Sequence, residues 1–348
     1  MSELKLKVVQ KNWETPDTCT IYFENVAGST VFYKPGQFLT FLLNLKGNEV
    51  RRSYSLCTVP VKDKHPAVAV KRVANGLGSN YLIDHLKIGD VLESMHPTGI
   101  FVPELSLSNK KEYFLIAAGS GISPLFSILQ TILLKEPKSI INLIFSNRNE
   151  ASIIFKTKLD DLELDYQDRL KVVHILTKPT VNWQGFRGRI NEQLLKDLIS
   201  ELNQFPKTDA LFFLCGPTDF MATAERTIKE LGFKTSAIKK EEFSTTNLMK
   251  DAKNEIGEEK QVKILYQNQE HEFLLAAGKS ILEGAQENGI RLPYSCTNGF
   301  CTACIGTCIE GEVDISRSDV LSENEKKQGL ILTCIGRPIS SKVVVKID

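Results

Sequence analysis

The sequence of 348 residues lacks several features that would place it in a broad class of protein. No apolar run reaches the roughly 18 residues that a membrane-spanning helix needs, and the opening MSELKLKVVQ alternates like a strand where a signal peptide would be apolar. No basic cluster interleaved with aromatic residues occurs, and the net charge is only +1, which argues against nucleic-acid and membrane-surface binding. The five histidines are scattered, so no histidine cluster points to acid–base chemistry. We expect a cytoplasmic protein.

The patterns that are present divide the chain into parts. Its length exceeds the size at which a single core stops growing, so two or three domains are expected. Residues 1–107 hold short alternating or β-branched runs between Gly, Pro and Asn, which predicts an antiparallel β-barrel or sandwich. In residues 108–243, apolar strands alternate with amphipathic stretches, which predicts an α/β domain whose parallel sheet has helices on both faces. The polar segment 244–260 is interpreted as a linker, and 261–348 as a small α+β domain.

Four of the eight cysteines form a metal-ligand pattern. Cys296, Cys301 and Cys304 follow C-x4-C-x2-C, and 29 residues separate Cys304 from Cys334. This is the plant-type [2Fe–2S] spacing, in which a local loop supplies three thiolates and a distant segment the fourth. Zinc is disfavoured because no second Cys or His lies at pair spacing beside Cys334. Cys308 falls where an alternating strand begins, so a core thiol is expected there rather than an alternative ligand.

The last domain resembles a known family in these same residues. PYSCTNGFCTAC, EGEVD and ILTCIGRP are similar to the C-terminal ferredoxin domain of modular oxygenase reductases, and the match covers essentially all of 261–348. The resemblance implies a β-grasp, plant-type ferredoxin fold that moves one electron at a time. Something upstream must then convert two-electron chemistry into single steps.

Two segments of the first domain resemble flavin-binding motifs of the ferredoxin–NADP reductase family. RSYS (Arg52, Ser53, Tyr54, Ser55) matches R-x-Y-S, and the segment VKRVANGLGS matches G-x-x-S, with Val70, Gly76, Gly78 and Ser79 as candidate contacts. The resemblance implies that Arg52 pairs with the flavin pyrophosphate, Tyr54 packs on the isoalloxazine ring and Ser55 bonds near N5. FAD is favoured, although the related phthalate dioxygenase reductase group uses FMN. An exposed strand segment that binds nothing remains the alternative for RSYS.

The second domain offers a site for the hydride donor. Gly119, Gly121 and Pro124 lie between a strand and a helix, the geometry that places a dinucleotide pyrophosphate at a helix N-terminus. A turn that binds nothing would also need glycine. Cys215, Gly216 and Pro217 resemble the C-G-P segment of the same family, in which the thiol lies beside the nicotinamide; a buried strand-end cysteine is the alternative.

Glu241 and Phe243 match the E-x-F ending of that family, in which the carboxylate lies near the reacting rings and the aromatic packs toward the flavin. A final strand with surface glutamates and one core Phe explains the same letters. Arg148 follows the second strand of the domain and Lys178 the third, with no acid at either point. Because a 2′-phosphate is bound by basic residues, NADPH is favoured over NADH, although NADH users also carry basic residues there.

Over the whole chain and in this domain order, the sequence resembles reductase components of multicomponent oxygenases, especially the phenylacetyl-CoA oxygenase reductase type. The resemblance implies electron transfer from NAD(P)H through FAD to the [2Fe–2S] cluster and on to a separate acceptor, an oxygenase component, with Ser55, Cys215 and Glu241 at the reacting rings. The alternatives are a flavin or quinone reductase, a hybrid-cluster-protein reductase and, as a non-enzyme, a redox-sensing iron–sulfur protein.

Overall fold

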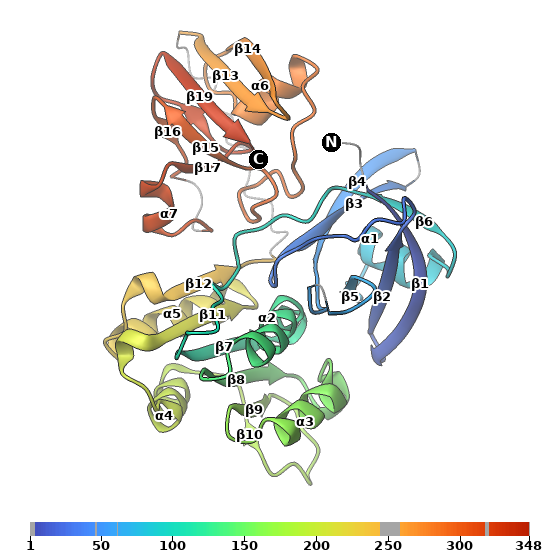
Figure 1. Ribbon diagram of the computed structural model, residues 1–348, viewed down its shortest axis with the longest axis vertical. Helices are drawn as coiled ribbons and strands as arrows, with labels where there is room; N and C mark the ends of the chain where they lie inside the picture. The colour runs from blue at the N-terminus through green and yellow to red at the C-terminus, as the bar shows by residue number, and fades with distance from the viewer. Residues whose placement is uncertain (1–3, 46, 61, 244–257, 317–319, 348) are drawn as a thin grey trace. The chain divides into compact units, whose positions relative to one another are not determined.

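The computed structural model describes residues 4–45, 47–60, 62–243, 258–316 and 320–347 (Figure 1). The chain divides into two compact units, of which one ends at Glu242 and the other begins at Phe243. The predicted linker, 244–260, lies outside the described residues except for its last three. None of the helices among the described residues is long and apolar enough to span a membrane.

The first unit begins with an antiparallel sheet of six strands, in the order β4-β3-β6-β1-β2-β5. The strands are β1 (Leu4–Thr15), β2 (Thr18–Asn25), β3 (Phe38–Leu45), β4 (Asn48–Ser55), β5 (Ala67–Lys71) and β6 (Val91–Ser94). An isolated bridge between Leu56 and Val68 joins the two edges of the sheet, so the strands close into the predicted barrel.

Alternation along the strands fills this barrel. In β1, Leu4, Leu6 and Val8 are buried while Lys5 and Lys7 are exposed, because successive side chains of a strand point to opposite faces. After β5 come a short helix α1 (Leu77–Asn80) and a π-helical turn (Tyr81–His85).

The rest of the first unit contains a parallel sheet in the order β10-β9-β8-β7-β11-β12. Its strands are β7 (Glu112–Ala118), β8 (Ile140–Asn147), β9 (Leu170–Leu176), β10 (Phe186–Arg187), β11 (Ala210–Cys215) and β12 (Ile238–Glu241). The helices between them are α2 (Ile122–Lys135), α3 (Lys156–Asp165), α4 (Glu192–Leu202) and α5 (Thr218–Glu230).

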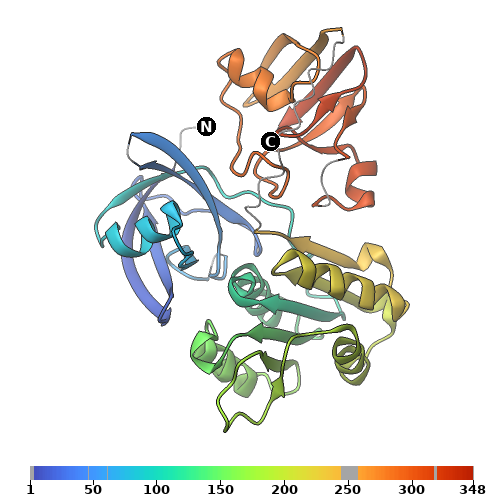
Figure 2. The same cartoon turned by 180° about the vertical axis from the view of Figure 1, so that it is seen from behind.

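Helices cover both faces of this sheet, as predicted (Figures 1 and 2). On one face, α2 and α3 pack on side chains such as Leu115 and Leu143. On the other, α4 and α5 pack on Phe114 and Ile144. Consecutive residues of one strand therefore belong to different cores, which is why these strands are apolar throughout instead of alternating.

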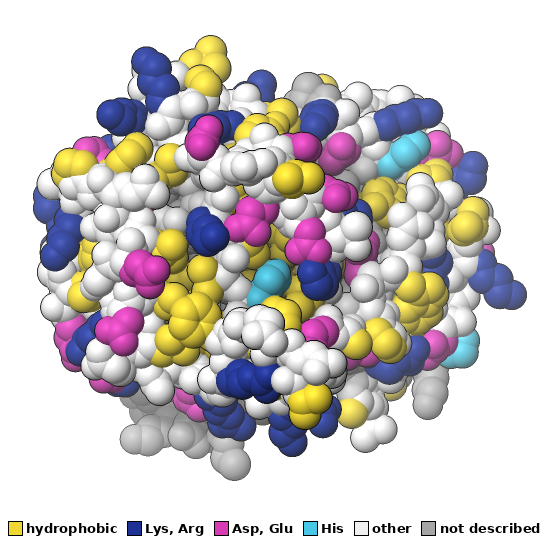
Figure 3. Space-filling model, turned by 90° about the horizontal axis from the view of Figure 1, so that it is seen from below, with side chains coloured by type: hydrophobic (Ala, Val, Ile, Leu, Met, Phe, Trp, Pro, Cys, Tyr) yellow, Lys and Arg dark blue, Asp and Glu magenta, His cyan; other side chains and the backbone are white. Residues whose placement is uncertain are grey.

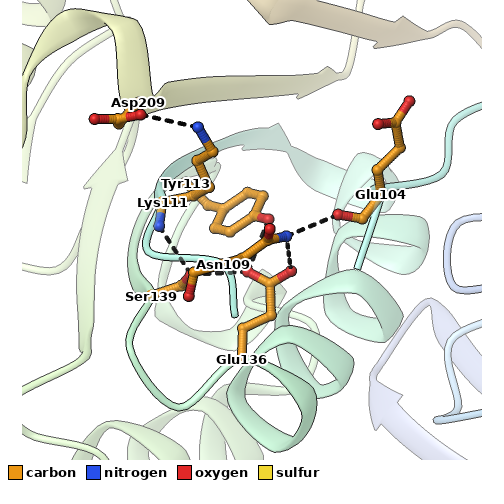
Figure 4. Close-up of polar contacts among 7 residues, drawn as sticks. All are labelled: Glu104, Asn109, Lys111, Tyr113, Glu136, Ser139 and Asp209. Carbon is orange, nitrogen blue, oxygen red and sulfur yellow. Dashed lines mark hydrogen bonds and ion pairs between the residues drawn. The ribbon is translucent and has the colours of Figure 1, made fainter. Parts of the chain in front are cut away.

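The amino ends of the parallel strands are tied together by a buried polar network (Figure 4). Glu136 follows the last turn of α2, and its carboxylate accepts hydrogen bonds from Tyr113 Oη (2.9 Å), Ser139 Oγ (2.8 Å) and Asn109 Nδ2 (2.6 Å). Beside it, Lys111 Nζ forms an ion pair with Asp209 at 2.9 Å. No sequence motif predicted this network, since its members come from separate elements.

The second unit holds a mixed sheet in the order β14-β13-β19-β15-β17, which agrees with the predicted β-grasp domain. Its strands are β13 (Lys260–Tyr266), β14 (Gln269–Leu275), β15 (Ile305–Glu310), β17 (Leu330–Leu332) and β19 (Lys342–Ile347), with a separate pair β16 (Val313–Asp314) and β18 (Arg337–Pro338). Helix α6 (Ile281–Glu287) starts at Ser280, which forms a capping box with Glu283. A short helix α7 (Glu323–Lys327) was not predicted.

The surface carries both signs of charge. On the face shown in Figure 3, Lys and Arg side chains are interspersed with Asp and Glu, with hydrophobic side chains in small groups between them. Some surface charges of the molecule are paired within one helix, as in Lys156 with Asp160 and Lys229 with Glu225. Such exposed pairs contribute little to stability.

Candidate active site and metal centre

The RSYS segment lies at the end of β4. Arg52 and Tyr54 point to the same side of this strand, and Tyr54 packs partly on the barrel core. Burial raises the pKa of Tyr54 to about 12, so its hydroxyl stays protonated. Ser53 Oγ lies 2.8 Å from Thr40 Oγ. Arg52 is exposed and its guanidinium contacts only the backbone oxygen of the preceding residue among described groups, which leaves further donors available.

The G-x-x-S segment is folded against this strand. Gly76 caps the start of α1, and a Cβ on Gly78 would come within 2.8 Å of Arg52 Cγ. Only glycine therefore permits this approach of the helix start to Arg52. The Ser79 hydroxyl already accepts a hydrogen bond from the Val73 amide at 3.1 Å, and its own proton remains to be donated. Val70 is buried on β5, opposite Cys19.

The glycine turn after β7 meets the end of β11. Gly119 has φ of +55°, a left-handed conformation that favours glycine. A Cβ on Gly121 would lie 2.1 Å from the backbone oxygen of Cys215, so the start of α2 can reach β11 only with glycine at this position. Pro124 is buried in the first turn of α2, where its missing N–H costs no intrahelical bond. The two predicted nicotinamide motifs are thus brought together.

Cys215, Gly216 and Pro217 end β11 and lead into α5, of which Pro217 is the N-cap residue. Cys215 is fully buried, and burial first, then the nearby Glu241, raises the pKa of its thiol well above the usual range. A Cβ on Gly216 would come within 2.9 Å of the Phe220 ring, so glycine permits close packing here too. The thiol is therefore neutral and shielded from solvent at physiological pH.

Ser55, Cys215 and Glu241 meet where the barrel touches the parallel sheet. Ser55 Oγ donates a hydrogen bond of 2.9 Å to Glu241 Oε2, across 186 positions of sequence. Glu241 lies on β12 in register with Cys215 on β11. Burial raises the pKa of Glu241 to about 8, with the Ser55 hydrogen bond acting in the opposite direction. Glu241 is thus protonated at neutral pH, although its side chain keeps some exposure.

Phe243 is a sequence-predicted site residue that does not belong to the same compact unit as Ser55, Cys215 and Glu241. It is 41% exposed and begins the other compact unit. Its packing toward a flavin stays a prediction.

Arg148 and Lys178 are neighbours at the carboxyl ends of β8 and β9. The Lys178 amide donates to the Arg148 carbonyl at 2.7 Å, and both side chains are exposed with no ionic or hydrogen-bonded partner among the described residues. The structure adds an acid that sequence reasoning missed, because Glu150 lies two residues beyond Arg148. Its carboxylate Oε1 accepts hydrogen bonds from the Thr180 amide (3.1 Å) and hydroxyl (2.5 Å).

The four predicted ligand cysteines of the second unit come together as two pairs. Cys296 Sγ lies 3.2 Å from Cys301 Sγ, and Cys304 Sγ lies 3.2 Å from Cys334 Sγ. Each iron of a [2Fe–2S] cluster takes two cysteine thiolates in a tetrahedral site, so two adjacent pairs fit this group. Among the described residues, no group of three or more His, Cys, Asp or Glu side chains is arranged to hold a single metal ion.

Crowding of these sulfurs polarises their protons. Hydrogen bonds from Cys301 and then Cys334 lower the pKa of Cys296, with the Asn298 and Phe300 amides acting in the same direction. The same hydrogen bonds to Cys296 raise the pKa of Cys301 and of Cys334, with burial acting in the same direction. Amide donors near the sulfurs are the expected environment for anionic thiolates.

The cysteine loop depends on its glycine. Gly299 has φ of +77° and packs against Ile335, the neighbour of Cys334, where a Cβ would come within 2.9 Å of Ile335 Cδ1. Cys308, expected as a core thiol, is only half-buried, and that expectation was wrong. Its Sγ contacts the carbonyls of Glu310 and Gly311 instead, because the turn after β15 folds back over it.

Comparison with known proteins agrees with this arrangement. Family models match an oxidoreductase FAD-binding domain (residues 5–102), an oxidoreductase NAD-binding domain (115–226) and a 2Fe-2S iron-sulfur cluster binding domain (264–338). The chain is 34% identical to a component of the 1,2-phenylacetyl-CoA epoxidase of Escherichia coli (strain K12), covering 99% of this chain and 97% of the relative.

Two further relatives have the same extent. The ferredoxin reductase component of 3-ketosteroid-9-alpha-monooxygenase from Rhodococcus rhodochrous is 30% identical, over 96% of this chain and 93% of its own. The solved structure of phthalate dioxygenase reductase, a modular protein for electron transfer from pyridine nucleotides to [2Fe-2S], has a TM-score of 0.61 at 25% identity and covers 99% and 98% of the two chains. The chain therefore belongs to the ferredoxin–NADP reductase family, in the group of oxygenase reductases that carry a C-terminal [2Fe–2S] ferredoxin domain.

Proposed function

We propose that this oxidoreductase takes electrons from NADPH and delivers them singly to a separate oxygenase component, one of the phenylacetyl-CoA type. The observation that carries the proposal is the combination, in one chain, of the Ser55–Glu241–Cys215 cluster with two cysteine pairs whose sulfurs are 3.2 Å apart. The relatives belong to an epoxidase and a monooxygenase, which supports an oxygenase as acceptor.

Residues 1–107 would form the FAD domain, 108–243 the nicotinamide domain and 261–348 the ferredoxin domain, with 244–260 between them. Arg52, Tyr54 and Ser55 with Gly76, Gly78 and Ser79 would hold the flavin. Gly119, Gly121 and Cys215 to Pro217 would hold the dinucleotide, and Cys296, Cys301, Cys304 and Cys334 the cluster. A flavin held by these residues would supply the chemistry that converts a two-electron donor into single-electron transfer.

The chain's own residues would position the reactants and hold protons. The buried Cys215 thiol is neutral, so it would offer the nicotinamide a polarizable surface without a negative charge. Glu241 holds a proton at neutral pH and accepts the Ser55 hydrogen bond, so the pair keeps one proton close to where a flavin N5 would lie. Neither role needs a histidine, in agreement with the scattered histidines.

NADPH is proposed over NADH because of the cations at the carboxyl edge. Arg148 and Lys178 are side by side and unpaired among the described residues, as a doubly charged 2′-phosphate would require. The carboxylate of Glu150 lies in the same loops, and its negative charge opposes the binding of a 2′-phosphate. The relative affinities for NADPH and NADH test the balance between these charges.

An anaerobic titration of the purified protein with NADPH, and separately with NADH, tests the proposal. We expect the flavin absorbance to bleach and the EPR signal of a reduced [2Fe–2S] cluster to appear. These changes should require a lower concentration of NADPH than of NADH. Cys334→Ser should retain flavin bleaching and lose the cluster signal, while Cys308→Ser, which alters a thiol outside the two pairs, should retain both. Bleaching without any cluster signal in the wild type would refute electron transfer to the cluster.

The acceptor is tested by stopped-flow mixing of the reduced protein with purified oxygenase component, free flavin or a quinone. Transfer to the oxygenase component should be the fastest of the three. Equal or faster transfer to free flavin or quinone would replace the proposal with a flavin or quinone reductase.

A further inference from the structure

Two loops meet at the carboxyl edge of the parallel sheet, and we call residues 148–155 and 177–185 the edge loops. They are joined by backbone hydrogen bonds from Thr177 N to Asn147 O (3.0 Å) and from Lys178 N to Arg148 O (2.7 Å). The first loop is itself fixed by a capping box between Asn149 and Ser152. The backbone under both cations is therefore held in place without any ligand.

A single carboxylate completes the junction. Glu150 Oε1 accepts hydrogen bonds from the Thr180 amide, at 3.1 Å, and the Thr180 hydroxyl, at 2.5 Å, and Oε2 also accepts from the Thr180 amide, at 3.2 Å. These bonds, with the Thr180 hydroxyl first, lower the pKa of Glu150, so the group is ionised at neutral pH. The carboxylate clasps the second edge loop while its negative charge remains at the protein surface.

Three cations belong to the edge loops and the strand that follows them. Arg148 and Lys178 lie on the edge loops, and their side chains have no ionic or hydrogen-bonded partner among the described residues. Arg187 also acts on the carboxylate electrostatically, and its guanidinium donates to the carbonyls of Val181 and Trp183 in the same region. A nucleotide phosphate arriving here would meet three positive charges and one negative charge.

We propose that Glu150 is a specificity-determining residue for the dinucleotide: its hydrogen bonds position the loop that carries Lys178, and its charge disfavours a 2′-phosphate relative to a 2′-hydroxyl. The inference rests on the proposed function, which places the adenosine ribose at this edge. Glu150 thus limits the preference for NADPH that Arg148 and Lys178 create. One unit charge acting through solvent over several ångströms changes affinity by about three- to tenfold.

Two substitutions separate the charge of Glu150 from most of its hydrogen bonding to Thr180. Glu150→Gln removes the charge and the Oε2–amide bond but keeps one carbonyl oxygen, which can still accept from the Thr180 hydroxyl and amide, whereas Glu150→Ala removes the charge and both acceptor oxygens. Isothermal titration of the flavin- and cluster-containing protein with 2′,5′-ADP and with 5′-AMP gives the two affinities directly, without relying on turnover.

Glu150→Gln should bind 2′,5′-ADP about three- to tenfold more tightly and 5′-AMP as the wild type does. Glu150→Ala should weaken binding of both probes, because the Lys178 loop loses its clasp. The matched control is Glu201→Gln, an exposed glutamate of α4 with no described hydrogen bond, which should change neither affinity.

The outcomes distinguish failure of the role proposed for Glu150 from failure of the proposed nucleotide site. If Lys178→Ala weakens 2′,5′-ADP binding but Glu150→Gln leaves the ratio of the two affinities unchanged, the role of Glu150 is refuted and the proposed nucleotide site stands. If Lys178→Ala and Arg148→Ala both leave 2′,5′-ADP binding unchanged, the edge does not bind the phosphate, and both proposals fail.

Discussion

The two edges of the parallel sheet differ in how far their polar side chains are hydrogen-bonded within the protein. At the amino edge, both oxygens of Glu136 are hydrogen-bonded, and those of Glu112 accept from two asparagines and two backbone amides. At the carboxyl edge, the buried side-chain amide of Asn147 has no partner among the described residues, and Arg148 and Lys178 are unpaired. The carboxylates of the amino edge are thus fully hydrogen-bonded within the fold. At the carboxyl edge, where ligands of such sheets bind, these three side chains have no described partner.

The difference follows from the direction of the elements. The end of α2 lies at the amino edge, so Glu136 can accept from the segments that enter β7 and β8 (Figure 4). At the carboxyl edge, strands give way to helix starts and loops, which is where anionic ligands of such sheets bind. Four experiments challenge this contrast, ordered from the largest expected effect to the smallest.

Removing an amino-edge carboxylate should be the most damaging change. Glu112→Ala leaves the Asn142 amide and the backbone N–H groups of Gln204 and Phe205 without their acceptor, and leaves the Asn203 amide with only the Phe205 carbonyl. We expect a loss of about 3 kcal/mol or more in the free energy of unfolding, measured by urea denaturation. Glu201→Ala on the exposed face of α4 should cost less than about 0.5 kcal/mol. A similar small cost for both would deny that the amino edge holds the fold.

Adding a methyl group at the carboxyl edge should cost both stability and ligand binding. In Gly121→Ala the new Cβ would lie 2.1 Å from the Cys215 oxygen, so α2 must move from β11. We expect about 1–3 kcal/mol of destabilisation and a lower affinity for 5′-AMP by calorimetry. Gly119→Ala, where nothing lies within 4 Å, should cost about 1 kcal/mol through its positive φ alone. Normal nucleotide binding by a folded Gly121→Ala variant would show that this junction does not shape the site.

Glu241, at the carboxyl end of β12, should make the stability of the protein depend on pH. Its pKa is raised to about 8 in the folded chain, so between about pH 5 and 8 the native state keeps a proton that the unfolded chain releases. Its contribution to stability is therefore present at low pH and lost as pH rises through 8. Between pH 5.5 and pH 8.5, the melting temperature measured by thermal unfolding should fall further in the wild type than in Glu241→Gln. An equal fall in the two proteins would contradict the raised pKa.

The smallest effects come from two exposed lysines, one at each edge. Lys111 pairs with Asp209 at the amino edge, so Lys111→Ala should cost up to about 1 kcal/mol. Lys178→Ala breaks no described contact and should leave the unfolding free energy unchanged while weakening 2′,5′-ADP binding. Destabilisation of the Lys178 variant equal to that of the Lys111 variant would remove the distinction between the edges.

Much of this arrangement was predictable because it depends on local patterns. Alternating runs predicted the barrel, and buried strands between amphipathic stretches predicted the parallel sheet. The cysteine spacing singled out four thiols that the fold brings together in pairs, and their role as cluster ligands stays a prediction. Cys308 was misjudged, since alternation does not reveal that a turn leaves one strand residue half-exposed. Glu150 was missed, since the acid was sought directly at the strand end rather than two residues beyond it.

By itself, the sequence determined the order of the domains, the periodicities of their elements and the spacing of the chemical groups, because these are properties of neighbours along the chain. Only the tertiary structure decided that Ser55 meets Glu241 across 186 positions, that Gly121 admits the backbone of Cys215, and that Glu150 clasps the loop of Lys178. Each of these contacts joins distant segments, and its pKa shift, steric fit or charge balance arises only when packing removes water and brings the groups together.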